Sequence, residues 1–225
     1  RDRSKEEFLQ EAAQIPGIYV PAFYEPVYRE DGTLEEMRIR EGSGAPEKVR
    51  KRVVENMDGA YFPVKTIIPS TEIVHDRVML ELFRGCIRGC RFCQAGYVYR
   101  PVRSRSPELL AQYGKAACED SGYQEMTLSS LSSTDYPCLL ELCDDLLDYC
   151  APRDIGLSLP SMRADTFSMN LMERLQRVRK GGLTFAPEAG TQRLRDAINK
   201  NLREEDLLQS VRTAFTGGWN GVKLY

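Results

Sequence analysis

From position 78 to its end, the sequence alternates between short strand-like runs and helical patterns. Five runs read as strands: 78–83, 125–131, 155–159, 182–186 and 221–225. A helical pattern fills each gap between them. Repeated strand–helix units form parallel sheets with right-handed crossovers, which are either open doubly wound sheets or barrels. The pattern therefore predicts an α/β fold and leaves both architectures open.

The helical patterns carry start and stop signals. Ser106 and Pro107 occupy favoured N-cap and first-turn positions, and Gly122 ends this first helix. The second helix follows Pro137, and the last gap holds two helical pieces that end at Gly217. The apolar stripes along these helices predict faces that pack on the sheet.

The part of the sequence before this alternation has a different character. Ser4 and Glu7 form a capping box ahead of a short helix. Two strand-like runs, 26–28 and 34–39, flank Asp31-Gly32, which predicts a β-hairpin. We therefore expect an N-terminal α+β extension.

The chain thus divides into an extension, residues 1–77, and an α/β core, residues 78–225. The extension either links an upstream domain to the core or covers the core as a lid, and the sequence does not separate these two roles. The chain starts at Arg1 and stops at Tyr225 within an apolar run. We expect it to be a piece of a longer protein whose core is truncated at the C-terminal side.

Charge and composition exclude several classes of function. Lysines and arginines number 31 against 33 acidic residues, a formal net charge of -2, whereas proteins that coat nucleic acid usually carry a basic excess. His75 is the sole histidine and is remote from any nucleophile elbow, which argues against a hydrolytic triad. Seven cysteines without an apolar leader or a membrane-length apolar run are typical of the reducing cytoplasm, with no membrane partner.

Three cysteines follow the first predicted strand with the spacing CxxxCxxC: Cys86, Cys90 and Cys93. Each iron of a cubane cluster takes one external ligand, so three thiolates on one loop can hold three irons and leave the fourth open. Gly85 and Gly89 allow the backbone to curl so that the three sulfurs can converge. The alternative is a structural zinc site with His75 as fourth ligand, although zinc sites favour paired CxxC spacings.

The four other cysteines lie on predicted helices or at a helix start: Cys118, Cys138, Cys143 and Cys150. We interpret them as buried structural thiols. A fourth cluster ligand drawn from among them is the alternative.

Six arginines and no acidic residue lie between Arg84 and Pro107, around the cysteine motif. A thiolate-ligated cluster is anionic, and nearby cations favour its reduced state and attract anionic ligands or an acidic electron donor such as flavodoxin or ferredoxin. For each single arginine, a solvated basic face is the alternative interpretation.

The cysteine spacing, with Phe92 directly before the last cysteine, resembles the cluster loop of the radical S-adenosylmethionine (SAM) superfamily. The resemblance implies a [4Fe-4S] cluster on Cys86, Cys90 and Cys93, with Phe92 against the adenine of SAM. It implies that the open iron chelates the amino and carboxylate groups of SAM. Reductive cleavage then gives methionine and a 5'-deoxyadenosyl radical, which abstracts hydrogen from a substrate that the sequence does not identify.

The same resemblance chooses between the two architectures. It implies a partial (βα)6 TIM-like barrel in which the cluster loop follows the first strand. About five strands are visible in this sequence, so the sixth is expected to be missing. In such a barrel the functional residues lie at the C-terminal ends of the strands.

Residues after the second, third and fourth strands are therefore candidates for binding SAM. Ser130 and Ser132 stand where related enzymes have a glycine-rich segment that holds the SAM amino group, and this chain departs from that segment. Arg163 suits the SAM carboxylate, and Glu188 suits the ribose hydroxyls or the amino group. For Ser130 and Ser132, the alternative is a hydroxyl-rich turn that caps the next helix at Asp135. For Arg163, the alternative is an ion pair with Asp165 or Glu188.

The combined motifs look most like radical SAM proteins with an upstream cobalamin-binding-like domain, and more distantly like RNA methylthiotransferases. Methyl or methylthio transfer to RNA or protein, with cobalamin bound by an upstream domain, is therefore an alternative activity. Methylthiotransferases carry a second cluster on three N-terminal cysteines, and no cysteine precedes Cys86 here. Outside enzymes, the alternative is a non-catalytic iron-sulfur or zinc module that transfers electrons or holds a partner.

Overall fold

The computed structural model describes residues 3–225, and the chain folds as two units, Arg1–Glu55 and Asn56–Tyr225. Each unit has a hydrophobic core of its own. The boundary falls upstream of residue 78, where the alternation of strands and helices begins. Part of the segment expected to belong to the extension therefore belongs to the second unit.

The first unit contains one long helix and one hairpin. Helix α1, Lys5–Ala13, begins at Ser4, whose hydroxyl accepts from the Glu7 N–H at 3.2 Å. The Glu7 carboxylate accepts in turn from the Ser4 N–H at 2.8 Å, which confirms the predicted capping box. Strands β1 (Tyr24–Tyr28) and β2 (Leu34–Ile39) pair antiparallel, which confirms the hairpin.

The hydrophobic core of the first unit is small. The 3₁₀ turn η1, Pro21–Phe23, leads into the hairpin and carries the fully buried Phe23. The core cluster consists of four buried residues: Ala13, Val20, Phe23 and Tyr24. Most hairpin side chains are exposed, so this cluster is what holds the helix and the strands together.

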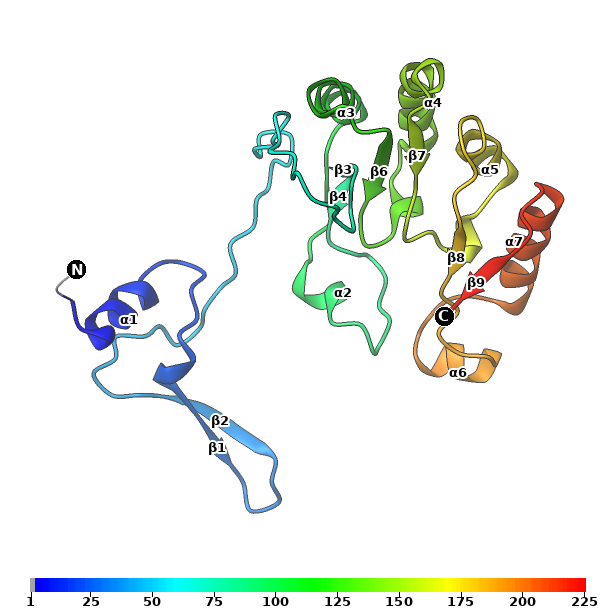
Figure 1. Cartoon of the computed structure of the whole chain (residues 1–225). Helices are drawn as coiled ribbons and strands as arrows, with labels where there is room; N and C mark the ends of the chain where they lie inside the picture. The colour runs from blue at the N-terminus through cyan, green and yellow to red at the C-terminus, as the bar shows by residue number, and fades with distance from the viewer. Residues whose placement is uncertain (1–2) are drawn as a thin grey trace. The chain divides into compact units, whose positions relative to one another are not determined.

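The second unit contains the alternation that the sequence predicts (Figure 1). Three parallel strands form one sheet, in the order β3 (Val78–Glu81), β6 (Glu125–Ser129) and β7 (Gly156–Ser158). Strands β8 (Leu183–Phe185) and β9 (Val222–Leu224) pair in parallel with each other. Each of these strands lies within one of the predicted runs, so the α/β class is confirmed.

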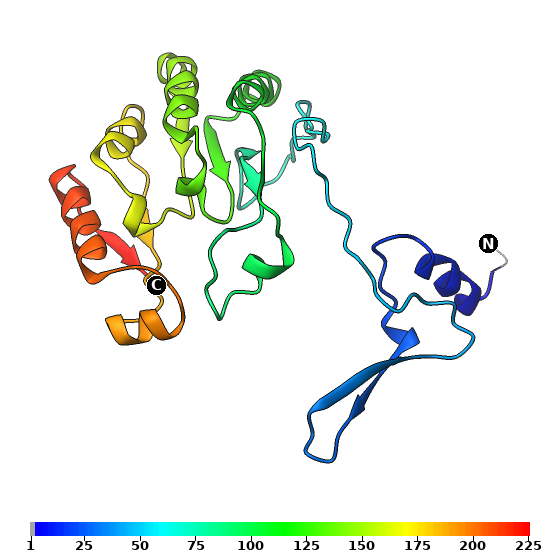
Figure 2. The same cartoon turned by 180° about the vertical axis from the view of Figure 1, so that it is seen from behind.

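The longer helices lie on one side of these strands, as Figures 1 and 2 show from opposite directions. They are α3 (Pro107–Ser121), α4 (Leu139–Cys150), α5 (Met169–Leu175) and α7 (Glu204–Thr216). Helix α3 ends at Gly122, which is left-handed with φ 73°, as predicted. Leu146 of α4 shares one buried cluster with Leu80 of β3 and Leu128 of β6. Apolar burial therefore holds the helix layer on the sheet.

The remaining elements are short and lie in the connections. They are β4 (Phe83–Arg84), α2 (Ala95–Val98), β5 (Arg103–Ser104), η2 (Ser133–Asp135), η3 (Ala151–Arg153), η4 (Ala164–Thr166) and α6 (Gln192–Ala197). In Figure 1, α2 and α6 lie beyond the ends toward which the arrows of β6 and β9 point. The connections that follow the strands therefore gather at one end of the unit.

The first predicted strand is divided in two. Residues 78–83 were expected to form one strand, but β4 leaves the parallel sheet and pairs antiparallel with β5. Leu82, between β3 and β4, is completely buried, and its N–H donates to the Ser129 carbonyl at 3.0 Å. The prediction was wrong at this end because the partner of β4 lies later in the chain, where local sequence does not reveal it.

The segment before β3 is fixed to the second unit. Arg105, 3% exposed, donates through Nη1 to the carbonyl oxygens of Met57 at 2.5 Å and Ala60 at 3.2 Å. Phe62 stacks on Tyr113 of α3, with ring centroids 4.7 Å apart. These contacts explain why the second unit begins near residue 56.

Within residues 3–225 the strands form no closed barrel. No ladder joins β7 to β8, and a cavity of about 590 Å³ lies between them. Its wall includes Ser158 of β7, Thr184 of β8 and the indole of Trp219. Neither the three motif cysteines nor the predicted SAM-binding residues line this cavity.

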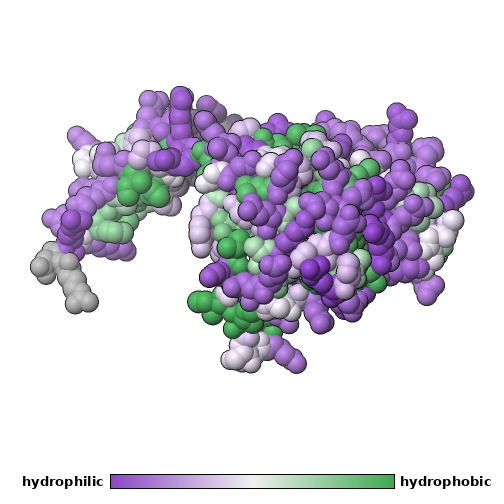
Figure 3. All heavy atoms as spheres, turned by 90° about the horizontal axis from the view of Figure 1, so that it is seen from above, coloured by the Kyte–Doolittle hydropathy of each residue, from purple (hydrophilic) through white to green (hydrophobic). Residues whose placement is uncertain are grey.

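The surface is largely polar. Hydrophilic side chains cover most of the face drawn in Figure 3, and apolar patches interrupt them. Of the helices formed by residues 3–225, none combines the length and the apolar character that a membrane crossing requires.

Candidate functional site

The three motif cysteines lie between β4 and α2, on residues 85–94, which we call the cysteine loop. Cys90 is buried, Cys86 and Cys93 are partly exposed, and all three are free thiols. Gly85 begins the loop at φ 95°, and a Cβ there would lie 2.7 Å from two backbone oxygens of the segment after α2. Glycine is therefore required at this turn.

Polar contacts fix the backbone around Cys86. The N–H of Arg88 points at Cys86 Sγ from 3.4 Å, and such contacts stabilise a thiolate and tune a bound cluster. The guanidinium of Arg100 donates to the carbonyl oxygens of Cys86, Ile87 and Arg88 at 3.4, 3.4 and 3.3 Å. The side chain of Arg100 thus holds the backbone of the loop itself.

The cysteine loop rests on residues 197–201, which we call the 197–201 turn. The Arg91 N–H donates to the Ile198 carbonyl at 2.9 Å, and its guanidinium donates to the Ala197 carbonyl at 2.5 Å. Asn199 donates through Nδ2 to the Gly89 carbonyl at 2.7 Å. Asn199 follows α6 at φ 54°, a left-handed conformation that asparagine tolerates well at a helix end.

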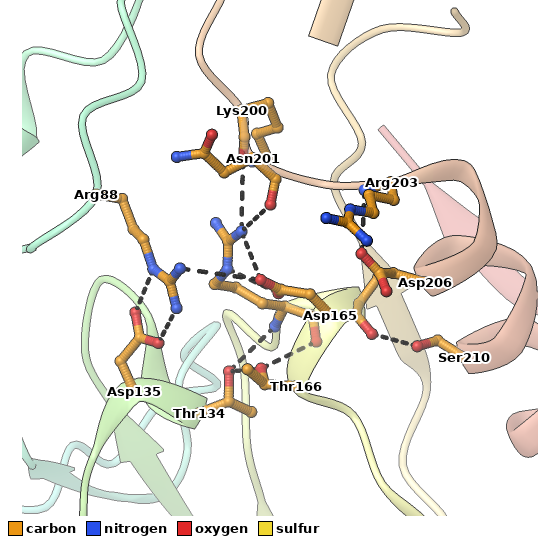
Figure 4. A network of polar contacts seen from close by, with 12 residues as sticks. Arg88, Thr134, Asp135, Asp165, Thr166, Lys200, Asn201, Arg203, Asp206 and Ser210 are labelled. Carbon is orange, nitrogen blue, oxygen red and sulfur yellow. Dashed lines mark hydrogen bonds and ion pairs between the residues drawn. The ribbon is translucent and has the colours of Figure 1, made fainter. Parts of the chain in front are cut away.

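Arg88 connects the cysteine loop to the ends of two strands (Figure 4). Its guanidinium forms a two-pronged ion pair with Asp135, which follows β6, with Nε 3.0 Å from Oδ2 and Nη2 bonded to Oδ1. Its Nη1 also lies 3.9 Å from a carboxylate oxygen of Asp165, which follows β7. The loop is therefore tied to the same end of the sheet that carries the predicted SAM residues.

The Arg88–Asp135 pair is mostly buried, with 25% and 11% of the two side chains exposed. Burial opposes ionisation of Asp135, but the hydrogen bonds and the charge of Arg88 outweigh it, so the pKa of Asp135 lies below its usual value. The same hydrogen bonds raise the pKa of Arg88. Both groups are therefore charged at neutral pH.

Arg163 follows β7 and is engaged by its neighbours. Its Nε and Nη2 lie 2.8 and 2.9 Å from the two carboxylate oxygens of Asp165, so the ion pair considered from the sequence is present. Nη2 also donates to the carbonyl oxygens of Lys200 at 3.4 Å and Asn201 at 3.2 Å. Arg163 thus joins the end of β7 to the 197–201 turn.

Ser130 and Ser132 follow β6, as expected. The hydroxyl oxygens of Ser130 and Ser133 lie 2.9 Å apart. Ser132 is 4% exposed, and its buried hydroxyl lies beside the Asp135 carboxylate, where it helps to lower the pKa of that group. The alternative that this turn caps the next helix is wrong, because Cys138 occupies the N-cap position of α4 and makes no side-chain cap.

Glu188 follows β8 at φ 66°, in the left-handed region that few residues other than glycine adopt. Its N–H donates to the Tyr225 carbonyl at 3.0 Å, and its carboxylate lies 3.3 Å from Lys200 Nζ. Phe92 is 54% exposed, and its ring centroid lies 6.0 Å from the same Nζ. Backbone outliers of this kind concentrate at functional sites.

Of the predicted site residues, Phe92, Arg163 and Glu188 thus meet around one turn, whereas Ser130 and Ser132 contact Ser133 and Asp135 after β6. The 197–201 turn contacts the cysteine loop, Arg163 and Glu188. Within residues 3–225, no three His, Cys, Asp or Glu side chains surround one point as the ligands of a single metal ion do. The thiolates that hold a cubane each bind a different iron, so they surround the cluster at a wider separation than the ligands of a single metal ion.

The four remaining cysteines lie in the helix layer. Cys118, Cys143 and Cys150 are buried, and Cys138 is partly buried at the start of α4. Burial raises the pKa of Cys143 to about 12 and those of Cys118 and Cys150 to about 11. These environments agree with structural thiols.

Three residues of this site were missed from the sequence. Asp135 was considered only as a helix cap, and Asn199 and Lys200 were not considered. A signal for the last two was present, because Asn199 and Asn201 flank Lys200, and asparagine tolerates positive φ. For Asp135 there was none beyond its position after a strand.

A comparison with protein families matches residues 80–224 to the Radical SAM superfamily. The match covers more than half of the chain, including the cysteine loop, the second half of β3 and the other four parallel strands. The chain therefore belongs to the radical SAM superfamily. Members of this superfamily are enzymes, and membership implies a [4Fe-4S] cluster and SAM as cofactors.

Two relatives come from Methanocaldococcus jannaschii. One, named "Uncharacterized protein MJ0966", is 37% identical over 147 residues, which are 65% of this chain and 32% of that protein. Another, named "Putative methylthiotransferase MJ0865", is 23% identical over 146 residues, 61% of this chain and 32% of that protein. The chain spans about one third of the length of these curated relatives.

The cysteine loop fits the implied cluster in its chemistry. It offers three free thiols on one short segment, and a backbone N–H already points at the sulfur of Cys86. The guanidinium groups of Arg91 and Arg100 bond backbone carbonyl oxygens of the 197–201 turn and of the loop, and cations near the loop suit an anionic cluster. The backbone outlier at Glu188 lies among the residues predicted to bind SAM.

Proposed function

We propose that this chain is the catalytic core of a radical SAM enzyme, in which Cys86, Cys90 and Cys93 ligate the [4Fe-4S] cluster. When bound, the cluster supplies the electron that cleaves SAM to methionine and a 5'-deoxyadenosyl radical, and this radical takes a hydrogen atom from the substrate. The observation that carries the proposal is the family match across the cysteine loop, where three free thiols lie on one short segment.

The side chains around the loop would bind and orient SAM. Phe92 offers an exposed ring to the adenine, and Glu188 offers acceptors for the ribose hydroxyls or the amino group. Ser130 and Ser132 are hydroxyl partners for the amino group at the end of β6. Arg163 reaches the SAM carboxylate only by sharing or exchanging its bond to Asp165, because that carboxylate already occupies its fork.

We further propose that the second unit is part of a (βα)6 barrel. The support is the family match, together with parallel strands that follow one another in chain order and helices that cover one side of them. In such a barrel the functional residues lie at the carboxyl ends of the strands. The cysteine loop, Asp135, Arg163 and Glu188 all have this position.

The second candidate function is methyl or methylthio transfer to RNA or protein. It is favoured by the similarity to a relative named as a putative methylthiotransferase, and cobalamin bound outside this chain would be its additional cofactor. The relatives are about three times longer than their matched segments, so substrate contacts and further cofactor sites would lie in segments not present here. An acidic electron donor such as flavodoxin or ferredoxin fits the arginine-rich cysteine loop.

The seven thiols also suit a reducing compartment, and we propose the cytoplasm. All seven are free, including buried ones such as Cys143. Proteins of oxidising compartments usually pair their cysteines.

The proposed cleavage is tested by product analysis. The full chain is reconstituted anaerobically with iron and sulfide, mixed with SAM and reduced with dithionite, and 5'-deoxyadenosine is measured by mass spectrometry. We expect the wild-type protein to form it and Cys93→Ala to form none, while Cys143→Ala, a buried thiol outside the loop, matches the wild type. Equal product from Cys93→Ala, or none from a wild-type protein that holds its cluster and binds SAM, would overturn the proposal.

A further inference from the structure

Lys200 occupies the space between two residues predicted to bind SAM. Its side chain is only 13% exposed, and Nζ lies 3.3 Å from Glu188 Oε1. The same ammonium lies 6.0 Å from the centroid of the Phe92 ring, at the outer limit of a cation–π contact. A lysine side chain loses rotamer freedom when most of it is buried, and contacts of its ammonium offset that cost. Glu188 and Phe92 are the partners here.

The backbone fixes Lys200 from both sides. Asn199 and Asn201 are left-handed, with φ 54° and 50°, so the chain reverses on each side of Lys200. Its N–H donates to the Arg195 carbonyl at 2.9 Å, and its own carbonyl accepts from Arg163 Nη2 at 3.4 Å. The side chain of Lys200 is therefore presented from a constrained turn.

The same turn is anchored to the cysteine loop. Asn199 holds the Gly89 carbonyl, and the Ile198 carbonyl accepts from the Arg91 N–H. Because the loop and Lys200 share this anchor, the ammonium keeps a fixed place relative to Phe92. Figure 4 shows Lys200 and Asn201 beside the ion-pair network that begins at Arg88.

Buried support also lies beneath the turn. Arg195, 2% exposed, donates to the carbonyl oxygens of Leu202 at 3.1 Å and Ala189 at 2.9 Å, and to Gln192 Oε1 at 3.1 Å. The Arg195 guanidinium therefore links Ala189, which follows Glu188, to Leu202, which follows the 197–201 turn. This buried link helps to fix the distance between Glu188 and Lys200.

We infer that Lys200 is a positioning residue of the SAM site: its ammonium holds the Glu188 carboxylate beside Phe92, where SAM binds. This inference rests on the proposed function and adds to it a residue with a defined role. Through its charge, Lys200 orients Glu188 before SAM arrives, so that the ligand meets an ordered acceptor. Its contribution is to SAM affinity and not to cluster assembly.

The test is SAM binding by the reconstituted full chain. Lys200→Met removes the ammonium, Lys200→Arg retains a cation, and Lys115→Met removes a lysine that pairs with Asp145 on the helix layer. Bound radiolabelled SAM is measured by anaerobic equilibrium dialysis, and iron and sulfide are measured for every sample. We expect Lys200→Met to keep its cluster and bind SAM about tenfold more weakly, since it loses a contact between charged groups. Lys200→Arg should recover most of the affinity, and Lys115→Met should match the wild type.

A double variant distinguishes positioning from a general structural effect. If Lys200 acts through Glu188, Lys200→Met should weaken SAM binding little further in a Glu188→Gln background. Thermal unfolding is followed in parallel, and Lys200→Gln replaces Lys200→Met should the latter fail to fold.

The outcomes separate the two proposals. A wild-type protein that holds its cluster but binds no SAM would contradict the proposed function. SAM binding by the wild type with equal affinity in Lys200→Met would overturn only the inference about Lys200. Loss of the cluster in Lys200→Met, or an undiminished effect of Lys200→Met in the Glu188→Gln background, would also overturn it.

Discussion

The two groups of cysteines in this chain occupy different environments. Cys86 and Cys93 are partly exposed and Cys90 is buried on a loop that polar contacts shape, whereas Cys118, Cys143 and Cys150 are buried and Cys138 is partly buried in the helix layer. Burial raises the pKa of Cys143 to about 12 and those of Cys118 and Cys150 to about 11. A metal or cluster ligand must be deprotonated. The comparison teaches that the environment of a cysteine, as much as its spacing, decides whether it can serve as a ligand.

The two regions are also stabilised differently. The helix layer is held by apolar side chains such as Leu80 and Leu146 that pack in one continuous core. The cysteine loop is held by directional contacts to distant parts of the chain, among them Arg88 to Asp135 and Asn199 to Gly89. Substitution of a single polar residue should therefore weaken the structure of the cysteine loop. A single cavity-forming substitution should instead lower the stability of the helix layer.

The largest expected contrast is between Cys90→Ala and Cys143→Ala. Cys90→Ala should abolish the reconstituted [4Fe-4S] cluster, because only two thiolates of the loop remain. Cys143→Ala should retain full iron and sulfide, measured per folded chain. Retention of the cluster by Cys90→Ala, or its loss in a folded Cys143→Ala protein, would reverse the assignment of the two groups.

Leu146→Ala should lower the free energy of unfolding by about 2–5 kcal/mol, because it leaves a cavity in the buried core. Leu146 is completely buried on α4. Urea denaturation followed by circular dichroism measures the change. The cluster content of the folded protein should stay at the wild-type level. A loss of unfolding free energy below about 2 kcal/mol would show that the helix layer packs loosely.

Asp135→Asn should lower the free energy of unfolding by about 1–3 kcal/mol, because it leaves the guanidinium of Arg88 without its charged partner. The reduced protein should also lose iron to a chelator faster than the wild type. Asp145→Asn is the matched control, since its ion pair with Lys115 is exposed and should contribute less than about 1 kcal/mol. If the two variants lost the same free energy of unfolding, the Arg88–Asp135 pair would contribute no more to stability than an exposed surface pair.

The same pair predicts a dependence on pH. The pKa of Asp135 is lowered below its usual 3.8 in the folded chain, so the pair stabilises the fold fully above that value. This contribution is lost as the pH falls through the lower, folded-state pKa. Urea denaturation as a function of pH should therefore show a shallower acid slope for Asp135→Asn than for the wild type. If the free energy of unfolding fell with decreasing pH equally steeply in both proteins, Asp135 would not be part of a stabilising charged pair.

Much of the fold could be predicted because its signals are local. The Ser4–Glu7 capping box and the left-handed Gly122 mark helix ends within a few residues of where they act. The division of the first strand could not be predicted, because β4 pairs with Arg103–Ser104 after the cysteine loop. Residue 56 begins the second unit for a similar reason, since the buried Arg105 fixes Met57 from a distance in sequence.

The candidate site shows the same limit. The three cysteines and Phe92 could be proposed from one short motif, as could Glu188 from its position after a strand. The contacts that hold this motif in place could not be predicted, because Asn199 meets Gly89 and Asp135 meets Arg88 only after the chain has folded. Spacing thus predicts which residues ligate a cluster, and non-local contacts determine how the loop that carries them is held.

The most direct test of the central proposal is electron paramagnetic resonance of the anaerobically reconstituted, dithionite-reduced chain, recorded with and without SAM and with Cys90→Ala as control. We expect a cluster signal that SAM perturbs and that Cys90→Ala lacks, because SAM would bind the iron that the three thiolates leave open. A cluster signal indifferent to SAM, or stoichiometric zinc in place of a cluster, would contradict the account.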